Sequence, residues 1–172
     1  MSQTSGNIIE PAGPHDRHVL WKRLADLEVA MLTTRDVDGE LHARPVQPVR
    51  VEEGRIWFFT SVNGGIADDV ARDAYVHLAF VDRDGGLYAS LGGDAMLLRD
   101  PEQARAMWST TAGVWYPGGP GDPTLGLLRV DVHRADYWDV KESRPVQFFR
   151  LAAAAMTGTR PDEVAVHRQF RT

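Results

Sequence analysis

Apolar and polar positions between residues 30 and 60 follow the two-residue period of β-strands. Residues 29–34 are apolar and rich in β-branched side chains, and the Asp-Gly pair that ends residues 36–39 is typical of a hairpin turn. Residues 55–60 (RIWFFT) form a second strand, so aromatic that both of its faces must be covered. We expect one face to lie in the core and the other to be covered by a flat ligand or a second subunit.

Between these two segments, a strand that begins near Glu40 is interrupted by Pro45 and Pro48. Proline has no backbone N–H, so part of this strand is expected at a sheet edge, at a bulge or against something other than a neighbouring strand. The segment therefore keeps main-chain polar groups that can bind another partner.

The rest of the chain alternates short strands with a few helices. Further strands are predicted at residues 75–81, 87–91, 94–99 and 125–133, the last continued by a β-like stretch at 137–138. Helices are predicted at residues 14–28, 66–74, from 101 onward with Asp100 as cap, and at 146–156. Residues 114–123 are too rich in glycine and proline for regular structure. This order favours a mainly β fold, an antiparallel barrel of six to seven strands with peripheral helices.

Length and composition narrow the class of protein. The 172 residues predict one domain over residues 1–172, with an arm at 1–13 and a C-terminal helix and peripheral tail at 140–172. Because cysteine is absent, disulfides and thiol chemistry are excluded. The formal charge of −5 argues against nucleic acid as a partner. Neither an export signal nor a membrane-spanning run is recognisable, and we expect a cytoplasmic protein with no membrane association.

Motifs for common catalytic sites are not found. His15 and His18 lie three residues apart, but no second pair has a ligand spacing, so we predict no metal site. The sequence holds neither a phosphate-binding loop ending in Gly-Lys-Ser/Thr nor a Gly-x-Ser-x-Gly elbow. The carboxylates lie mainly in turns, where solvation explains them. We assign no catalytic side chain.

Arg44 gives the best candidate for ligand binding. It lies on the proline-interrupted strand, close in sequence to the aromatic strand and to the turn at residues 61–65. A forked cation, flat apolar area and available main-chain groups suit a flat phosphorylated cofactor. The alternative is that Arg44 is a solvated edge charge and the aromatic residues belong to the core.

The chain also resembles a known family over residues 19–139. The shared features, in order, are TT-x3-DG-x4-RPV, WFFT, YVHLAF, LYASLGGDA, a tryptophan at position 108, WYPGGPGDP, LGLLRV and A-x-YWD. Their order and spacing resemble the general stress protein branch of the pyridoxamine 5′-phosphate oxidase-like superfamily.

This resemblance implies a split β-barrel that binds a flavin, usually FMN, at the interface of a homodimer. It implies that Arg44 approaches the flavin phosphate, and that Val46 and Gln47, after Pro45, lie along the isoalloxazine edge. It places Phe59 and Thr60 near the ribityl phosphate. Further candidates for cofactor binding are Trp57, Phe58, Ser61, Gly65, Trp115 and Tyr116.

The sequence departs from the family pattern at one point. Members that bind FMN commonly carry a lysine at the head of the helix after the aromatic strand, where this chain has Asn63-Gly64-Gly65-Ile66-Ala67.

The first hypothesis is an FMN-binding homodimer of the general stress type, a flavin-dependent oxidoreductase acting on an unknown small molecule. The alternatives are a non-catalytic dimer that has lost flavin and serves as a stress-related binding module, and a deazaflavin-binding reductase. Pyridoxamine phosphate oxidase activity itself is not expected, because the C-terminal Arg-x-His pattern is missing.

Overall fold

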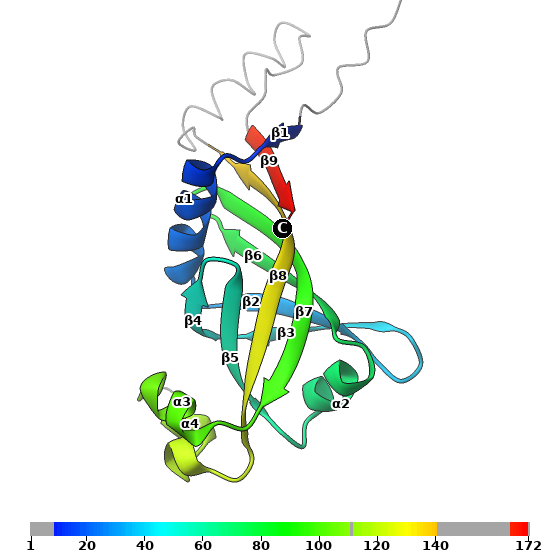
Figure 1. Ribbon diagram of the computed structural model, residues 1–172, viewed down its shortest axis with the longest axis vertical. Coiled ribbons are helices and arrows are strands. Elements are labelled where there is room, and N and C mark those ends of the chain that lie inside the picture. Colours follow the sequence, from blue (N-terminus) through cyan, green and yellow to red (C-terminus); the bar gives the residue numbers. More distant parts are fainter. Residues whose placement is uncertain (1–8, 111, 141–165, 172) are drawn as a thin grey trace, which may run out of the picture.

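The computed structural model describes residues 9–110, 112–140 and 166–171. Its strands form one nine-stranded sheet that curls into a split barrel, with helices at its periphery (Figure 1). The order of the main path is β1-β9-β8-β7-β6-β2-β3, and β5 pairs with both β8 and β4. The mainly β fold expected from the sequence is confirmed, but the described residues form nine strands and not six or seven, and one pair, β1 with β9, is parallel.

The two central hairpins are present, but the single strand predicted from near Glu40 is divided into two strands with different partners. β2 (Ala30–Arg35) pairs antiparallel with β3 (Leu41–Val46), and β4 (Pro48–Glu52) pairs with β5 (Arg55–Ser61). In the first turn, the Asp36 carboxylate accepts hydrogen bonds from the backbone N–H groups of Asp38 and Glu40. Gly39 has a φ of 84°, a conformation that L side chains rarely adopt.

The two prolines lie where a missing N–H costs little. Among the strands that the structure describes, β3 ends the path of the sheet and pairs only with β2, so Pro45 is on an edge strand. Pro48 opens β4, and the register with β5 shifts between Pro48 and Arg50. The sequence predicted such positions: Pro45 lies on an edge strand, and Pro48 lies next to a shift in strand register.

The later strands are longer than the sequence indicated. They are β6 (Tyr75–Asp82), β7 (Leu87–Leu98) and β8 (Leu125–Asp139). The prediction of two strands around Gly92-Gly93 is wrong, since β7 is continuous. The register shifts between these glycines because β8 carries one extra residue, His133, opposite them. β8 borders β5 over Leu125–Asp131 and β9 over Arg134–Asp139, and this change of partner opens the barrel.

Both ends of the described chain join the sheet. β9 (Val166–Arg171) pairs antiparallel with β8, and β1 (Ile9–Pro11) pairs parallel with β9. The expectation of a peripheral tail is therefore wrong for residues 166–171, whereas residues 9–11 of the N-terminal arm are ordered by their contact with β9. Phe170, 4% exposed, fixes β9 by packing edge-on against Trp21.

Helices lie around the sheet (Figure 1). Among the described residues, the two longest are α1 (Pro14–Ala25), which buries Leu20, Trp21 and Leu24, and α2 (Gly65–Arg72). α3 (Pro101–Ala106) begins at Asp100, whose carboxylate accepts from the N–H groups of Glu102 and Gln103, as predicted. In the Gly/Pro-rich segment, α4 (Ala112–Trp115) and a 3-10 turn (Gly119–Gly121) correct the expectation of no regular structure. The predicted helix at 146–156 lies outside the described residues.

The aromatic strand β5 divides its side chains between two apolar clusters. Ile56 and Phe58, each 0% exposed, belong to the main core with α1 and the inner faces of the strands. Trp57, 3% exposed, packs on the other face in a second cluster. Its buried partners there are Ala104, Met107, Leu125 and Leu127. The chain itself therefore covers both faces at Trp57, and the expectation of a ligand or second subunit there is wrong.

Among the described residues, none of the helices has the length and apolar composition needed to cross a membrane.

Candidate cofactor site

Arg44 extends from the edge strand β3 toward the start of α2. One guanidinium nitrogen, Nη1, donates to the Thr34 hydroxyl at 2.7 Å, and Nη2 donates to the Asp69 carboxylate at 3.0 Å. Nη2 is also 3.0 Å from the Nδ1 of His42. The Arg44 side chain keeps 27% of its surface exposed, so it is anchored and still reaches solvent. It is not a freely solvated edge charge.

Thr34 and Asp69 complete a closed network with Arg44. The Thr34 hydroxyl, which accepts from Arg44, donates to Asp69 Oδ2 at 2.7 Å. Thr34 is 1% exposed and Asp69 is 5% exposed. A buried carboxylate requires such partners, because leaving it unpaired would cost several kcal/mol.

The charge state of Asp69 follows from these contacts. Burial alone raises the pKa of Asp69, but the hydrogen bonds from Thr34 and Arg44 and the charges of Arg44 and Arg72 outweigh it, so the pKa is below its ordinary value. Arg72 Nη1 lies 3.7 Å from Asp69 Oδ1. Asp69 is thus an anion at neutral pH, next to the cation expected to bind a phosphate.

The start of α2 adds backbone donors to the site. Its N-cap, Gly64, has no side chain to cap the helix, and a Cβ built on Gly65 would lie 3.4 Å from Arg44 Nη2. The first N–H groups of a helix lack intrahelical acceptors and carry a partial positive charge. An anion here would meet the guanidinium together with these amides, which fits a phosphate group.

Strand β5 ends at the same turn. The Ser61 hydroxyl accepts from the Asn63 N–H at 3.2 Å, and the Ser61 carbonyl accepts from the Gly64 N–H at 3.3 Å. The structure therefore brings Arg44, Ser61 and Gly65 of the predicted site to one end of the barrel. Thr60, the residue before Ser61, is 9% exposed.

The other predicted residues lie in different surroundings. Pro45 and Gln47 are exposed on the edge after Arg44, and Val46 packs partly against the main core. The side chains of Trp57 and Phe58 are enclosed by the chain, which leaves Phe59 as the accessible aromatic residue of β5.

Trp115 and Tyr116 do not join Arg44 within one subunit. Tyr116 packs edge-on against Phe59 at 6.4 Å between ring centroids, whereas Trp115 is 77% exposed. They lie at α4, which is well separated from α2 in Figure 1. If Trp115 and Tyr116 contact a cofactor held by Arg44, that Arg44 must belong to the other subunit.

Sequence reasoning missed Thr34, Asp69 and His42 as parts of the site. Two signals were present: Thr34 stands two positions from Leu32 on an alternating strand, and Asp69 directly precedes the core residue Val70 in α2. A polar residue at an inward position needs a buried partner, and Arg44 supplies it for both.

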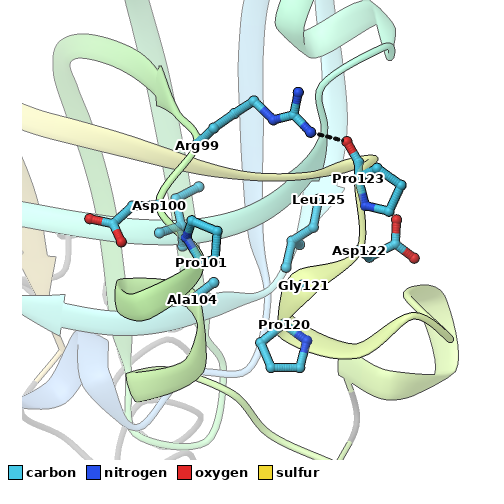
Figure 2. A pocket seen from close by; sticks show the side chains of 10 residues that line it. Arg99, Asp100, Pro101, Ala104, Pro120, Gly121, Asp122, Pro123 and Leu125 are labelled. Carbon is cyan, nitrogen blue, oxygen red and sulfur yellow. Dashed lines mark hydrogen bonds between the residues drawn. The ribbon is translucent and has the colours of Figure 1, made fainter.

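A cleft elsewhere in the molecule is too small for a flavin. It lies between α3 and the 3-10 turn, with Asp100 and Pro101 on one side and Pro120 to Pro123 on the other (Figure 2). Arg99 closes it by donating to the Pro123 carbonyl. Its volume is about 60 Å³, whereas sites for drug-sized ligands have roughly 300 to 1,000 Å³.

Comparison with known proteins defines the class of this chain. The family model described as pyridoxamine 5′-phosphate oxidase like matches residues 15–162. The chain therefore belongs to this family, as its sequence motifs indicated.

Two similar solved structures are described as general stress proteins. The crystal structure of a general stress protein 26 from Jannaschia sp. has a TM-score of 0.73 and 27% identity, over 90% of this chain and 97% of that one. A general stress FMN/FAD binding protein from Xanthomonas citri has a TM-score of 0.65 and 34% identity, over 74% of this chain and 90% of that one. Protein bli-3 of Neurospora crassa is 30% identical over 119 residues, 63% of this chain. The match spans 57% of the length of that protein, less than two thirds.

Proposed function

We propose that this protein is a flavin-binding homodimer of the general stress type, with FMN as the flavin and a flavin-dependent redox reaction on a small molecule as its activity. The observation that carries the proposal is the placement of Arg44. Its anchored guanidinium lies beside the uncapped start of α2, within one subunit. The Xanthomonas citri relative is described as an FMN/FAD binding protein, which supports the same class of ligand.

The residues of this chain have distinct roles in the proposal. Arg44 and the first N–H groups of α2 bind the phosphate, and Ser61 lies beside them. Val46 and Gln47 line the path of the ring system, Phe59 lies near the ribityl phosphate, and Trp115 with Tyr116 approaches the flavin from the second subunit. The flavin supplies the redox chemistry, so the protein needs only to bind, orient and shield it.

The first test is whether the purified protein carries or takes up FMN. We expect flavin absorption bands in the protein as isolated or, after removal of any ligand, quenching of FMN fluorescence on titration. A folded protein that shows neither, and whose melting temperature does not change with FMN, would exclude the proposal. It would instead favour the non-catalytic dimer, for which the pairing of Arg44 with Asp69 is the motivating observation.

The second test replaces the phosphate-binding cation. We expect Arg44→Ala to weaken FMN binding about ten- to a hundredfold, since charged hydrogen bonds contribute about 1.5 to 3 kcal/mol. The matched control is Arg35→Ala, which removes the same charge from an exposed side chain of β2 that forms a surface ion pair with Asp73. Riboflavin, which lacks phosphate, should bind both variants with similar affinity. Equal FMN affinity in the two variants would show that Arg44 does not hold the phosphate.

A further inference from the structure

We propose that Asp69 sets the phosphate charge that this site accepts, so that a flavin with a singly charged phosphodiester binds at least as tightly as FMN, whose phosphate is a doubly charged monoester. This inference rests on the proposed function, because it concerns the same phosphate position at Arg44. It adds the chemical class of flavin that the site favours and the residue responsible.

The geometry gives Asp69 direct access to the binding cation. Asp69 Oδ2 accepts from Arg44 Nη2 at 3.0 Å and from the Thr34 hydroxyl at 2.7 Å. The Asp69 side chain is 6% exposed, whereas that of Arg44 is 27% exposed. Solvent and salt screen a buried carboxylate poorly. The negative charge of Asp69 therefore reaches any anion that Arg44 binds.

The charges around the site show why one negative charge on the ligand is favoured over two. From β3 come Arg44 and His42, and from α2 come Asp68, Asp69 and Arg72. The positive charges of Arg44 and Arg72 are matched by the negative charges of Asp68 and Asp69. No lysine occurs between Lys22 and Lys141, so none adds charge at the head of α2. A phosphate monoester carries a charge of about −1.5 to −2 at pH 7, whereas a phosphodiester carries a single negative charge.

Asp69 is not needed merely to orient Arg44. The guanidinium is also held by the Thr34 hydroxyl at 2.7 Å and lies 3.0 Å from His42. An asparagine at position 69 would keep an oxygen that accepts from Arg44 and Thr34 and would lose only the charge. The Asp69→Asn variant therefore separates the charge of this residue from its hydrogen bonds.

The experiment compares three probes in three proteins. Riboflavin, FMN and the monomethyl phosphate ester of FMN are titrated by fluorescence at pH 8, where the FMN phosphate is fully charged. The proteins are the wild type, Asp69→Asn and the control Asp68→Asn, which removes the same charge from the adjacent exposed residue of α2. Melting temperatures establish that each variant is folded.

The expected result is a change confined to FMN. In the wild type, the methyl ester should bind at least as tightly as FMN. Asp69→Asn should tighten FMN binding about tenfold and should change riboflavin and the ester by less than about threefold. Asp68→Asn should change all three by less than about threefold.

Two results would overturn the inference while leaving the proposed function intact. One is a wild type that binds FMN more than about tenfold tighter than its methyl ester, a ratio that decides the matter even if Asp69→Asn fails to fold. The other is weaker FMN binding by folded Asp69→Asn, which would make Asp69 a positioning residue for Arg44. Failure of folded wild type to bind any of the three flavins would instead reject the proposed function together with the inference.

Discussion

At the scale of single residues, Thr34 connects the two charges of the candidate site. Its hydroxyl accepts from Arg44 and donates to Asp69, each at 2.7 Å, so both of its hydrogen-bonding capacities are used. Neither Arg44 nor Asp69 keeps its full set of buried partners without this hydroxyl. The orientation of the proposed phosphate-binding cation thus depends on a residue that need not touch the ligand.

We expect Thr34→Val to destabilise the protein by about 1 to 3 kcal/mol, because the isosteric side chain leaves buried polar groups unsatisfied. It should also weaken FMN binding, since Arg44 loses one of its anchors. The matched control is Thr33→Val, which makes the same change at the preceding position, on the opposite face of β2. Urea unfolding at pH 7 and FMN titration measure the two effects. Equal unfolding free energies in the two variants would contradict the role of Thr34.

The head of α2 carries Ile66 where a lysine would add a cation. Ile66 is partly buried and packs against the main core, so a change here alters packing as well as charge. We therefore compare Ile66→Lys with Ile66→Gln, in which a long polar side chain replaces isoleucine without charge. Ile66→Lys should bind FMN about tenfold more tightly than Ile66→Gln, and riboflavin should not distinguish them. Equal FMN affinities would place the phosphate away from the start of α2.

At the scale of elements, a bulge where β8 passes Gly92 and Gly93 of β7 lets the two paired strands follow the curvature of the barrel. The register with β8 shifts between Gly92 and Gly93, and a Cβ built on Gly93 would lie only 2.3 Å from the Asp131 carbonyl oxygen. A backbone contact this close cannot be relieved by rotating a side chain. Gly93 is therefore required where β7 passes β8, and the Gly-Gly pair is not a break between two strands.

Gly93→Ala should destabilise the fold by about 1 to 3 kcal/mol, the usual cost of overpacking a closed site. Gly121→Ala is the control, because a Cβ there has nothing within 4 Å and the residue has no positive φ. Chemical denaturation of both variants gives the comparison. A Gly93→Ala protein as stable as the control would show that β7 can move away from β8 at little cost.

The sequence predicted most elements because their signals are local. The Asp-Gly turn after β2, the prolines of an edge strand and the Asp100 cap each act within a few residues. β9 was missed because its partner β8 is separated from it in sequence and because Val166–Arg171 is charged, although Phe170 is buried. The Thr34–Asp69 contact was missed for the same reason, since it spans 35 positions. Arg44 could be named because it lies on a proline-interrupted strand close in sequence to the aromatic strand, and a family motif marks it as well.

At the scale of the whole molecule, one face of the sheet is apolar and exposed. Met31 of β2 pairs with Ala79 of β6 and with Pro45 of β3, and Val81 of β6 pairs with Tyr88 of β7. Directly paired residues, and residues two apart on a strand, share a face. Met31, Val81 and Tyr88 are 39%, 57% and 41% exposed in one subunit. Contiguous apolar surface of this kind marks an interaction site, and we propose that a second copy of the chain covers it.

This face gives a test of the homodimer. We expect the wild type to be dimeric by analytical ultracentrifugation. Val81→Lys should shift the equilibrium toward monomers, because a two-fold interface would bury two copies of the new lysine charge, one from each subunit. Val37→Lys, at the tip of the hairpin between β2 and β3, is the control: Val37 is 73% exposed and lies off this face. If the flavin site is shared between subunits, Val81→Lys should also weaken FMN binding at concentrations where it is monomeric. A monomeric wild type, or a Val81→Lys protein as dimeric as the control, would mean that Trp115 and Tyr116 of a second subunit are not brought to Arg44 through this face.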